Sequence, residues 1–287
     1  MKHFFTLAAL AITAALSAQT EVRVSSFMFS MGVCPTFSVI FENTDAHTVE
    51  KWFKDQLDPI SADVSNKKEV MSIGTRLPEV SSDTIRVYAK ADQSKKTMPV
   101  TLHLAFRVNG SYVGPDNDKR QVEGCRSWIL QHAVMLKKEV AQRQVEEATK
   151  QQKLLEDDLA MLVKEKDRAQ NSIEHTQNKA TEEGQEKVQV EGDIVTIGTR
   201  VDAKKAEVSN TPTEDNIKEL EGLLKDQKKL KSRSEKLAKQ IEDANQKVVD
   251  LQEDIKKNLA DQEAKGKTIE AQKKVVADLQ AKLANIN

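Results

Sequence analysis

Aromatic residues are scarce in this sequence, and none occurs after Trp128. They make up 4% of the 287 residues, whereas charged residues make up 31%. A chain with so few large apolar side chains cannot bury one hydrophobic core along its whole length. We therefore expect an aromatic-rich globular region before Trp128 and a charged region of a different kind after it.

The sequence also lacks a surplus of either charge. Its 44 Lys and Arg residues are balanced by 45 Asp and Glu residues, which gives a formal net charge of −1. Surfaces that bind nucleic acid, and polybasic patches that bind membranes, carry an excess of basic residues. The composition therefore predicts that nucleic acid is not a partner.

The motifs of common catalytic and metal sites are missing as well. The chain has no nucleophile elbow, phosphate loop, glycine-rich dinucleotide fingerprint, CxxC or HExxH. His47, His103, His132 and His175 are scattered without the spacing of metal ligands. We therefore expect a protein that is not an enzyme and that has no catalytic, cofactor-binding or metal-binding residues.

Only the N-terminus contains a long apolar run. The sequence MKHFFTLAALAITAALSAQT places Lys2 before an apolar stretch from Phe4 to Leu16, and small residues follow at Ser17-Ala18. This layout is typical of a secretory signal peptide and is too short for a spanning helix. We predict a signal peptide at residues 1–18, export to the periplasm or the medium, and no integral membrane segment in the mature chain. A buried N-terminal helix or a retained anchor is the alternative.

The chain has two cysteines, Cys34 and Cys125. An oxidising compartment permits a disulfide between them, and closing a loop of roughly 90 residues would stabilise the fold by about 4–5 kcal/mol in the chain-entropy model. Two separate buried or free thiols are the alternative, and both interpretations remain open at this point.

Residues 19–126 have the pattern of a small α+β head domain. Val49, Phe53 and Leu57 recur at helical spacing after Asp45, a good N-cap, and so predict an amphipathic helix over 46–57. Alternating or continuous apolar runs predict strands on both sides of this helix: residues 22–29, 36–41, 69–73, 84–89 and 100–108. The expected order is β-β-α-β-β-β, an antiparallel sheet with one helix on it.

Residues 127–287 have the pattern of a coiled coil. Apolar residues recur at alternating spacings of three and four in two long stretches, for example at Leu155, Leu159 and Leu162, which is the heptad seam of a left-handed coiled coil. Apolar residues from Trp128 to Leu136 exceed what a seam needs. We expect this surplus to pack against the head.

The stretch SNTPTED interrupts the helical pattern near its middle. Thr211 as N-cap, Pro212 at the first helical position and Glu214 two residues later fit the start of a second helix. Folding the chain about Pro212 aligns the two seams, so that Val201 meets Leu223. We therefore predict an antiparallel coiled-coil hairpin within one chain, with its tip at 209–213. A parallel dimer that is kinked at Pro212 is the alternative.

Three segments of the head carry a resemblance: GVCPTFSVIFENTDAHTVEKWFKDQL, DTIRVYAKAD and VTLHLAFRVNGSYV. Together with the two helical arms, they resemble a group of secreted proteins of Gram-negative bacteria that have a small α+β head and a long coiled-coil hairpin. The resemblance implies this architecture and a location in the cell envelope. It implies no activity and no catalytic residues.

These observations predict an exported envelope protein that acts as a scaffold, spacer or adaptor through its hairpin. The tip residues Asn210, Thr211, Pro212 and Thr213 are the candidate contacts for an envelope protein partner of unknown identity. The alternative is a head that binds a peptide or another ligand, with the coiled coil used for docking or self-association.

Overall fold

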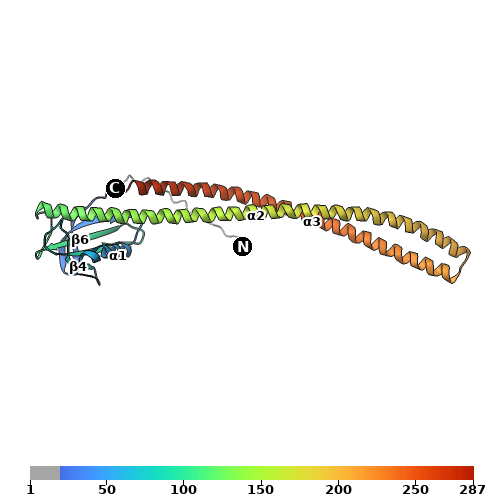
Figure 1. Cartoon of the computed structure of the whole chain (residues 1–287), viewed down its shortest axis with the longest axis horizontal. Coiled ribbons are helices and arrows are strands. Elements are labelled where there is room, and N and C mark those ends of the chain that lie inside the picture. The colour runs from blue at the N-terminus through green and yellow to red at the C-terminus, as the bar shows by residue number, and fades with distance from the viewer. Residues whose placement is uncertain (1–19) are drawn as a thin grey trace. The chain divides into compact units, whose positions relative to one another are not determined.

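The computed structural model describes residues 20–287, and the predicted signal peptide at 1–18 lies outside them. An antiparallel sheet forms the N-terminal part. Two long helices that pack against each other follow, α2 (Lys119–Asn210) and α3 (Glu214–Ala284) (Figure 1). The predicted α+β head and helical hairpin are therefore confirmed. The chain divides into two compact units: one runs to Lys150 and includes Lys273–Asn287, and the other is Gln151–Gln272.

All strand pairings in the head are antiparallel, in the order β1-β2-β6-β5-β4-β3, with β7 paired to β6. The seven strands are β1 (Arg23–Phe29), β2 (Gly32–Phe41), β3 (Asp63–Asn66), β4 (Val70–Thr75), β5 (Ile85–Asp92), β6 (Val100–Val108) and β7 (Ser111–Tyr112). The five strands that the sequence predicted are present. The two shortest, β3 and β7, were not predicted.

One face of the sheet carries the main core of the head. Alternate residues of β6, such as Leu102, Leu104 and Phe106, are fully buried there, as the period of a strand requires. Helix α1 (Ala46–Leu57) packs on this face through Val49, Phe53 and Leu57, and a short 3-10 turn, η1 (Asp58–Ile60), ends it. Asp45 is the N-cap, as predicted. Its carboxylate accepts from the Thr48 backbone N–H at 2.9 Å and from the Thr48 hydroxyl at 2.7 Å.

The start of α2 completes this core. Trp128, Ile129, Ala133 and Leu136 are buried in the same cluster as the sheet residues, and α2 runs beside the sheet and α1 in Figure 1. The prediction that the base of the hairpin packs against the head is therefore confirmed. The surplus apolar residues at this end of the helix fill the space above the sheet.

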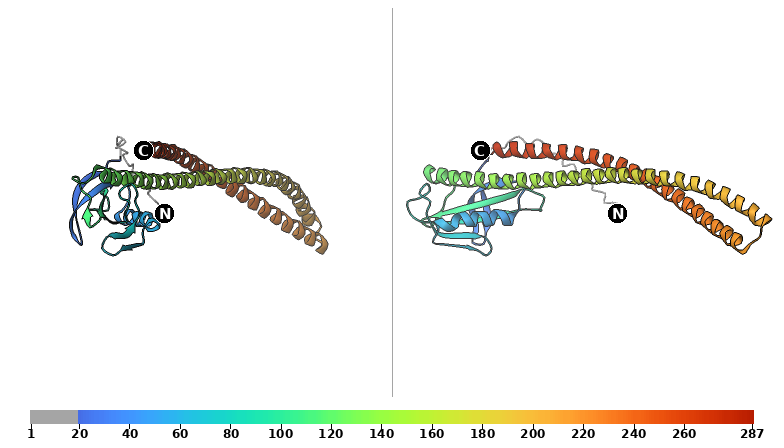
Figure 2. Two further views of the ribbon diagram at one scale, coloured as in Figure 1. Left: turned by 60° about the vertical axis from the view of Figure 1, so that its left-hand side comes forward. Right: turned by 45° about the vertical axis from the view of Figure 1, so that its right-hand side comes forward.

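The hairpin keeps one register along the second unit. Ion pairs join α2 to α3 between Asp158 and Lys265 at 3.0 Å, between Glu186 and Arg233 at 2.5 Å, and between Lys204 and Glu219 at 2.5 Å. Asp158 and Lys265 lie 54 and 53 residues from Pro212, and Lys204 and Glu219 lie 8 and 7 residues from it. Glu186 and Arg233 lie 26 and 21 residues from Pro212, so this pair joins positions more than one helical turn out of step. Val201 and Leu223, which the sequence aligns with each other, are buried in one apolar cluster. The chain turns back at the tip between α2 and α3 in both views of Figure 2, so it is not one long helix kinked at Pro212, as the alternative of a parallel dimer requires.

The tip differs from the prediction in its capping residue. Thr213, not Thr211, is the N-cap of α3: its hydroxyl accepts from the Asn216 N–H at 3.3 Å, and its carbonyl accepts from the Ile217 N–H at 3.1 Å. Thr211 is instead bound to the end of α2, because its N–H donates to the Glu207 carbonyl at 2.8 Å. Pro212 therefore precedes the cap. The shift leaves Glu214 in the first turn, where the helix dipole favours a carboxylate.

Gly124 generates a test of the packing between α2 and the head. A Cβ atom at Gly124 would lie 2.1 Å from the Glu79 carbonyl oxygen, which is backbone and cannot move aside easily. We expect Gly124→Ala to lower the free energy of unfolding of the head by about 1–3 kcal/mol. Urea unfolding followed by tryptophan fluorescence measures this directly, since both tryptophans, Trp52 and Trp128, lie in the head.

Gly184→Ala is the matched control for this substitution. Gly184 is also a helical glycine of α2, but no atom lies within 4 Å of its added Cβ. Alanine there should stabilise the helix by about 0.5–1 kcal/mol. Equal effects of the two substitutions would contradict the close approach at Gly124.

Candidate functional site

The β1–β2 hairpin, called the arm below, joins the sheet through β2, and its turn end lies over the face of the sheet opposite α1 and α2. At its turn, the Ser30 N–H and hydroxyl donate to the Glu69 carboxylate at 3.2 and 2.5 Å. Phe29 packs against Tyr88 of β5 with ring centroids 6.2 Å apart. Phe29, Tyr88 and Cys34 belong to a second, smaller core cluster under the arm. This face of the sheet is therefore partly buried by the chain itself.

A chain of hydroxyl groups lies beneath the arm and ends at a histidine. The Ser25 hydroxyl is bonded to Thr36 Oγ1 at 2.9 Å and to Ser38 Oγ at 2.8 Å. Ser38 Oγ is in turn 2.9 Å from His103 Nδ1, and Phe27 stacks on the imidazole with centroids 4.1 Å apart. No local pattern in the sequence indicates this cluster, because only the strand register brings Ser38 opposite His103.

A serine bonded to an imidazole is half of a nucleophile–base arrangement. In this cluster, however, Ser38 Oγ is shared with Ser25, and no carboxylate of residues 20–287 is hydrogen-bonded to His103. Thr36 is fully buried and Ser38 is 8% exposed. The arrangement is well suited to holding β1, β2 and β6 together.

The remaining histidines occupy separate places. His132 stacks on Trp128 with centroids 4.1 Å apart, and its Nδ1 lies 2.7 Å from the Trp128 carbonyl oxygen, so this histidine is part of the packing of α2 on the head. His175 is exposed on α2, and His47 lies near the start of α1. Among the described residues, no group of three or more His, Cys, Asp or Glu residues is arranged to hold a metal ion.

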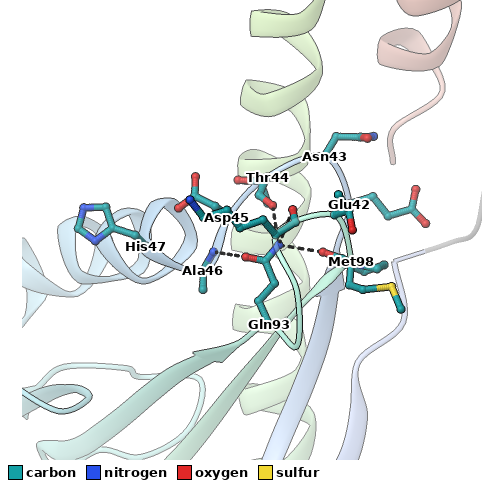
Figure 3. Close-up of a pocket in the computed structure, with 11 residues that line it drawn as sticks. Glu42, Asn43, Thr44, Asp45, Ala46, His47, Gln93 and Met98 are labelled. Carbon is teal, nitrogen blue, oxygen red and sulfur yellow. Dashed lines mark hydrogen bonds between the residues drawn. The ribbon is translucent and has the colours of Figure 1, made fainter. Parts of the chain in front are cut away.

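A pocket of about 940 Å³ lies at the N-terminal end of α1 (Figure 3). The loop before α1 and the loop between β5 and β6 form its walls. Gln93 joins these loops: its side-chain oxygen accepts from the Ala46 N–H at 3.4 Å, and its amide donates to the carbonyls of Met98 at 2.8 Å and Thr44 at 3.4 Å. The Glu42 and His47 side chains point away from Gln93 in the figure. Polar side chains such as Asp45 and Gln93 line the pocket together with the apolar residues Met98 and Pro99.

The tip residues Asn210, Thr211, Pro212 and Thr213 are all exposed. Directly behind them, Lys204 closes the hairpin. Its ammonium group bonds to Glu219 at 2.5 Å, Glu207 at 3.0 Å and Asn216 Oδ1 at 3.1 Å, and its side chain is only 11% exposed. The hydrogen bond to Glu219 raises the pKa of Lys204, so the ammonium group stays charged. The tip loop is thus exposed on a closed end of the hairpin.

The two cysteines are free thiols buried in different clusters, so the predicted disulfide between Cys34 and Cys125 is not formed in this structure. Cys34 lies under the arm, whereas Cys125 lies in the main core on the other side of the sheet. The sequence alone does not show on which face of its strand the Cys34 side chain lies. Cys34 is the cross-strand partner of Phe27, and both side chains face the smaller cluster between the hairpin and the sheet. Burial raises the pKa of the Cys125 thiol to about 12.

No protein-family model matches this chain, and no curated protein matches it significantly. Within residues 20–287, none of the helices combines the length and the apolar character needed to cross a bilayer. The resemblance to secreted envelope proteins therefore stays a prediction.

Thiol counting tests the state of the cysteines. Because both thiols are buried and Cys125 ionises only near pH 12, we expect a chromogenic disulfide reagent at pH 8 to react slowly with the folded protein. After denaturation without reductant, the reagent should detect two thiols per chain. Detection of none would restore the disulfide.

The two partly buried histidines, His103 and His132, predict a loss of stability in acid. Partial burial lowers the pKa of His103 and of His132 below the ordinary value of 6.5. The charge of Asp92 opposes the shift of His103, and the hydrogen bond to the Trp128 carbonyl, followed by the charge of Glu79, opposes that of His132. The unfolded chain therefore binds more protons than the folded chain once the pH falls to about 6.5 and below. The free energy of unfolding should be highest above this pH and should decrease as the pH falls toward 5.

The comparison that checks this is the melting temperature at pH 8 and pH 5.5. The wild-type head should melt several degrees lower at pH 5.5, and a His103→Asn, His132→Gln variant should show a smaller difference between the two pH values. His175→Gln changes an exposed histidine and serves as the control. An equal pH dependence in all three proteins would argue against the two buried imidazoles as its source.

Proposed function

We propose that this protein is an exported, non-enzymatic scaffold or adaptor of the bacterial envelope, and that its hairpin carries the contact with a partner. The observation that carries the proposal is the closed seam of the hairpin. Its apolar layers, such as Ile197, Val201 and Leu223, are buried between its own two helices. At this level the seam is therefore covered within one chain, and the tip is left for contacts.

The length of the hairpin supports a spacing role. In the second unit, α2 contributes roughly 60 residues before the tip, and at a rise of 1.5 Å per residue this part is about 90 Å long. Ion pairs between the helices recur along it, from Asp158–Lys265 to Lys204–Glu219. Such a pair of helices holds its exposed tip at a fixed distance from the far end of the same unit.

The composition of the tip supports a polar protein contact. Asn210, Thr211 and Thr213 provide amide and hydroxyl groups, and Glu214 and Asp215 add negative charge at the start of α3. A partner surface with backbone groups and basic side chains would complement this set. Export, the periplasmic location and the identity of this partner are parts of the proposal.

A second candidate function is ligand binding by the head, which the pocket beside Gln93 favours. In this interpretation the hairpin serves for docking or self-association. The two functions differ in which surface makes the specific contact, and that difference can be measured.

A photo-crosslinking amino acid at Thr211 tests the proposal in living cells. We expect one specific envelope protein to be captured, because the side chain at this position is exposed at the tip. Glu235 is exposed on the flank of the hairpin and provides the matched control position. Capture at Thr211 but not at Glu235 supports an adaptor that acts through its tip. Self-adducts alone, or the same products at both positions, would contradict it and favour the head.

A further inference from the structure

Strand β1 forms one outer edge of the sheet, and no other strand of residues 20–287 pairs with it on its outer side. Edge strands present unpaired backbone N–H and C=O groups, and proteins usually protect them with short length, Lys, Pro or a bulge. The other edge, β3, has four residues and begins with Asp63. In contrast, β1 has seven residues, its register with β2 is unbroken, and Val24–Phe29 contains neither Lys nor Pro.

The arm that contains β1 also exposes apolar side chains. Met28 and Val33 are cross-strand neighbours and are 65% and 64% exposed, and Met31 at the turn is 42% exposed. Their strand neighbours Phe27 and Cys34 point the other way, into the small cluster beneath the arm. An edge with free backbone groups and an apolar flank is suited to pairing with another extended segment.

Two copies of β1 that run antiparallel can be aligned about Ser26. In that register Val24 of one copy lies opposite Met28 of the other, on the same face, and Ser26 lies opposite itself. A two-fold axis makes the same contact twice, as in the isologous interfaces of most homodimers.

The same register also brings opposite charges of the two copies near each other. Arg23 of one copy lies opposite Phe29 of the other, next to Ser30 and its carboxylate partner Glu69. Within residues 20–287, Glu69 has no basic side chain at ion-pair distance, and Arg23 is paired only with Glu21, where both side chains are more than 60% exposed. A second copy would therefore bring a cation to an uncompensated carboxylate.

We propose that two copies of this protein associate through their β1 strands, antiparallel about a two-fold axis at Ser26. The paired strands join the two sheets into one and cover Met28 and Val33. This inference goes beyond the proposed function and does not depend on it, because it concerns the head and not the tip.

Disulfide trapping at the axis tests the geometry in the full-length protein. In antiparallel pairing, directly opposite residues have Cα atoms about 4.5–5.5 Å apart, which is within reach of a disulfide. Purified Ser26→Cys, oxidised with copper phenanthroline, should form a covalent dimer on a non-reducing gel. Met98→Cys and Leu259→Cys place the new thiol at other exposed positions, in the head and on the hairpin. They should form far less dimer.

A lack of dimer with Ser26→Cys would overturn the proposal. So would an equal yield with Leu259→Cys, which would indicate association through the coiled coil or random collision instead.

The association itself should depend on Met28. A charged side chain in the strand flank opposes edge pairing, so Met28→Lys should weaken self-association at least about tenfold in sedimentation equilibrium. Met98→Lys adds the same charge at a residue with 52% exposure outside the arm and should have little effect. Because Met28 is 65% exposed, its replacement should leave the melting temperature of the head unchanged. The β1 dimer would be refuted if the wild-type protein stayed monomeric at about 100 times the concentration of a typical assay. It would also be refuted if Met28→Lys and Met98→Lys weakened self-association equally.

Discussion

The contact between Trp128 and the aromatic residues of the sheet and α1 is the one on which the head depends. Its ring lies 6.2 Å from both Phe53 and Phe106, centroid to centroid, and it is 5% exposed. Trp128 is also the last aromatic residue of the chain. The sheet and its single short helix would leave one side of this core open without it. The first turns of α2 are therefore as much a part of the head as the strands are.

Much of this architecture can be predicted from the local spacing of apolar residues in the sequence. The alternation of Val100, Leu102, Leu104 and Phe106 identifies a half-buried strand, and the spacing of Val49, Phe53 and Leu57 after Asp45 identifies α1. The heptad pattern also contains the register, since equal distances from Pro212 pair Val201 with Leu223. These features were predictable because each depends on neighbours within a few residues or on one strict repeat.

The features that the sequence did not reveal depend on contacts between distant segments. The arm lies over the sheet because Phe29 packs against Tyr88 and Ser30 is hydrogen-bonded to Glu69. No local sequence pattern predicts these two contacts. The hydroxyl chain to His103 and the burial of the two cysteines on opposite sides of the sheet follow from the same strand arrangement. At the tip, Thr211 and Thr213 can both cap a helix. The choice is decided by α2, because the Thr211 N–H is bonded to the Glu207 carbonyl and Thr211 thus belongs to the end of that helix.

In the hairpin, ion pairs that are individually weak connect two helices whose register is strictly defined. Partly exposed ion pairs such as Asp158–Lys265 contribute little free energy individually, but this pair joins residues at nearly equal distances from Pro212 and so fits the register of the apolar seam. That symmetry about Pro212 constrains how the gene can change. An insertion in one arm alone would displace every layer beyond it, whereas seven residues added to both arms at matched levels would preserve the seam. In evolution, the hairpin can therefore be lengthened or shortened only in paired steps, one in each arm.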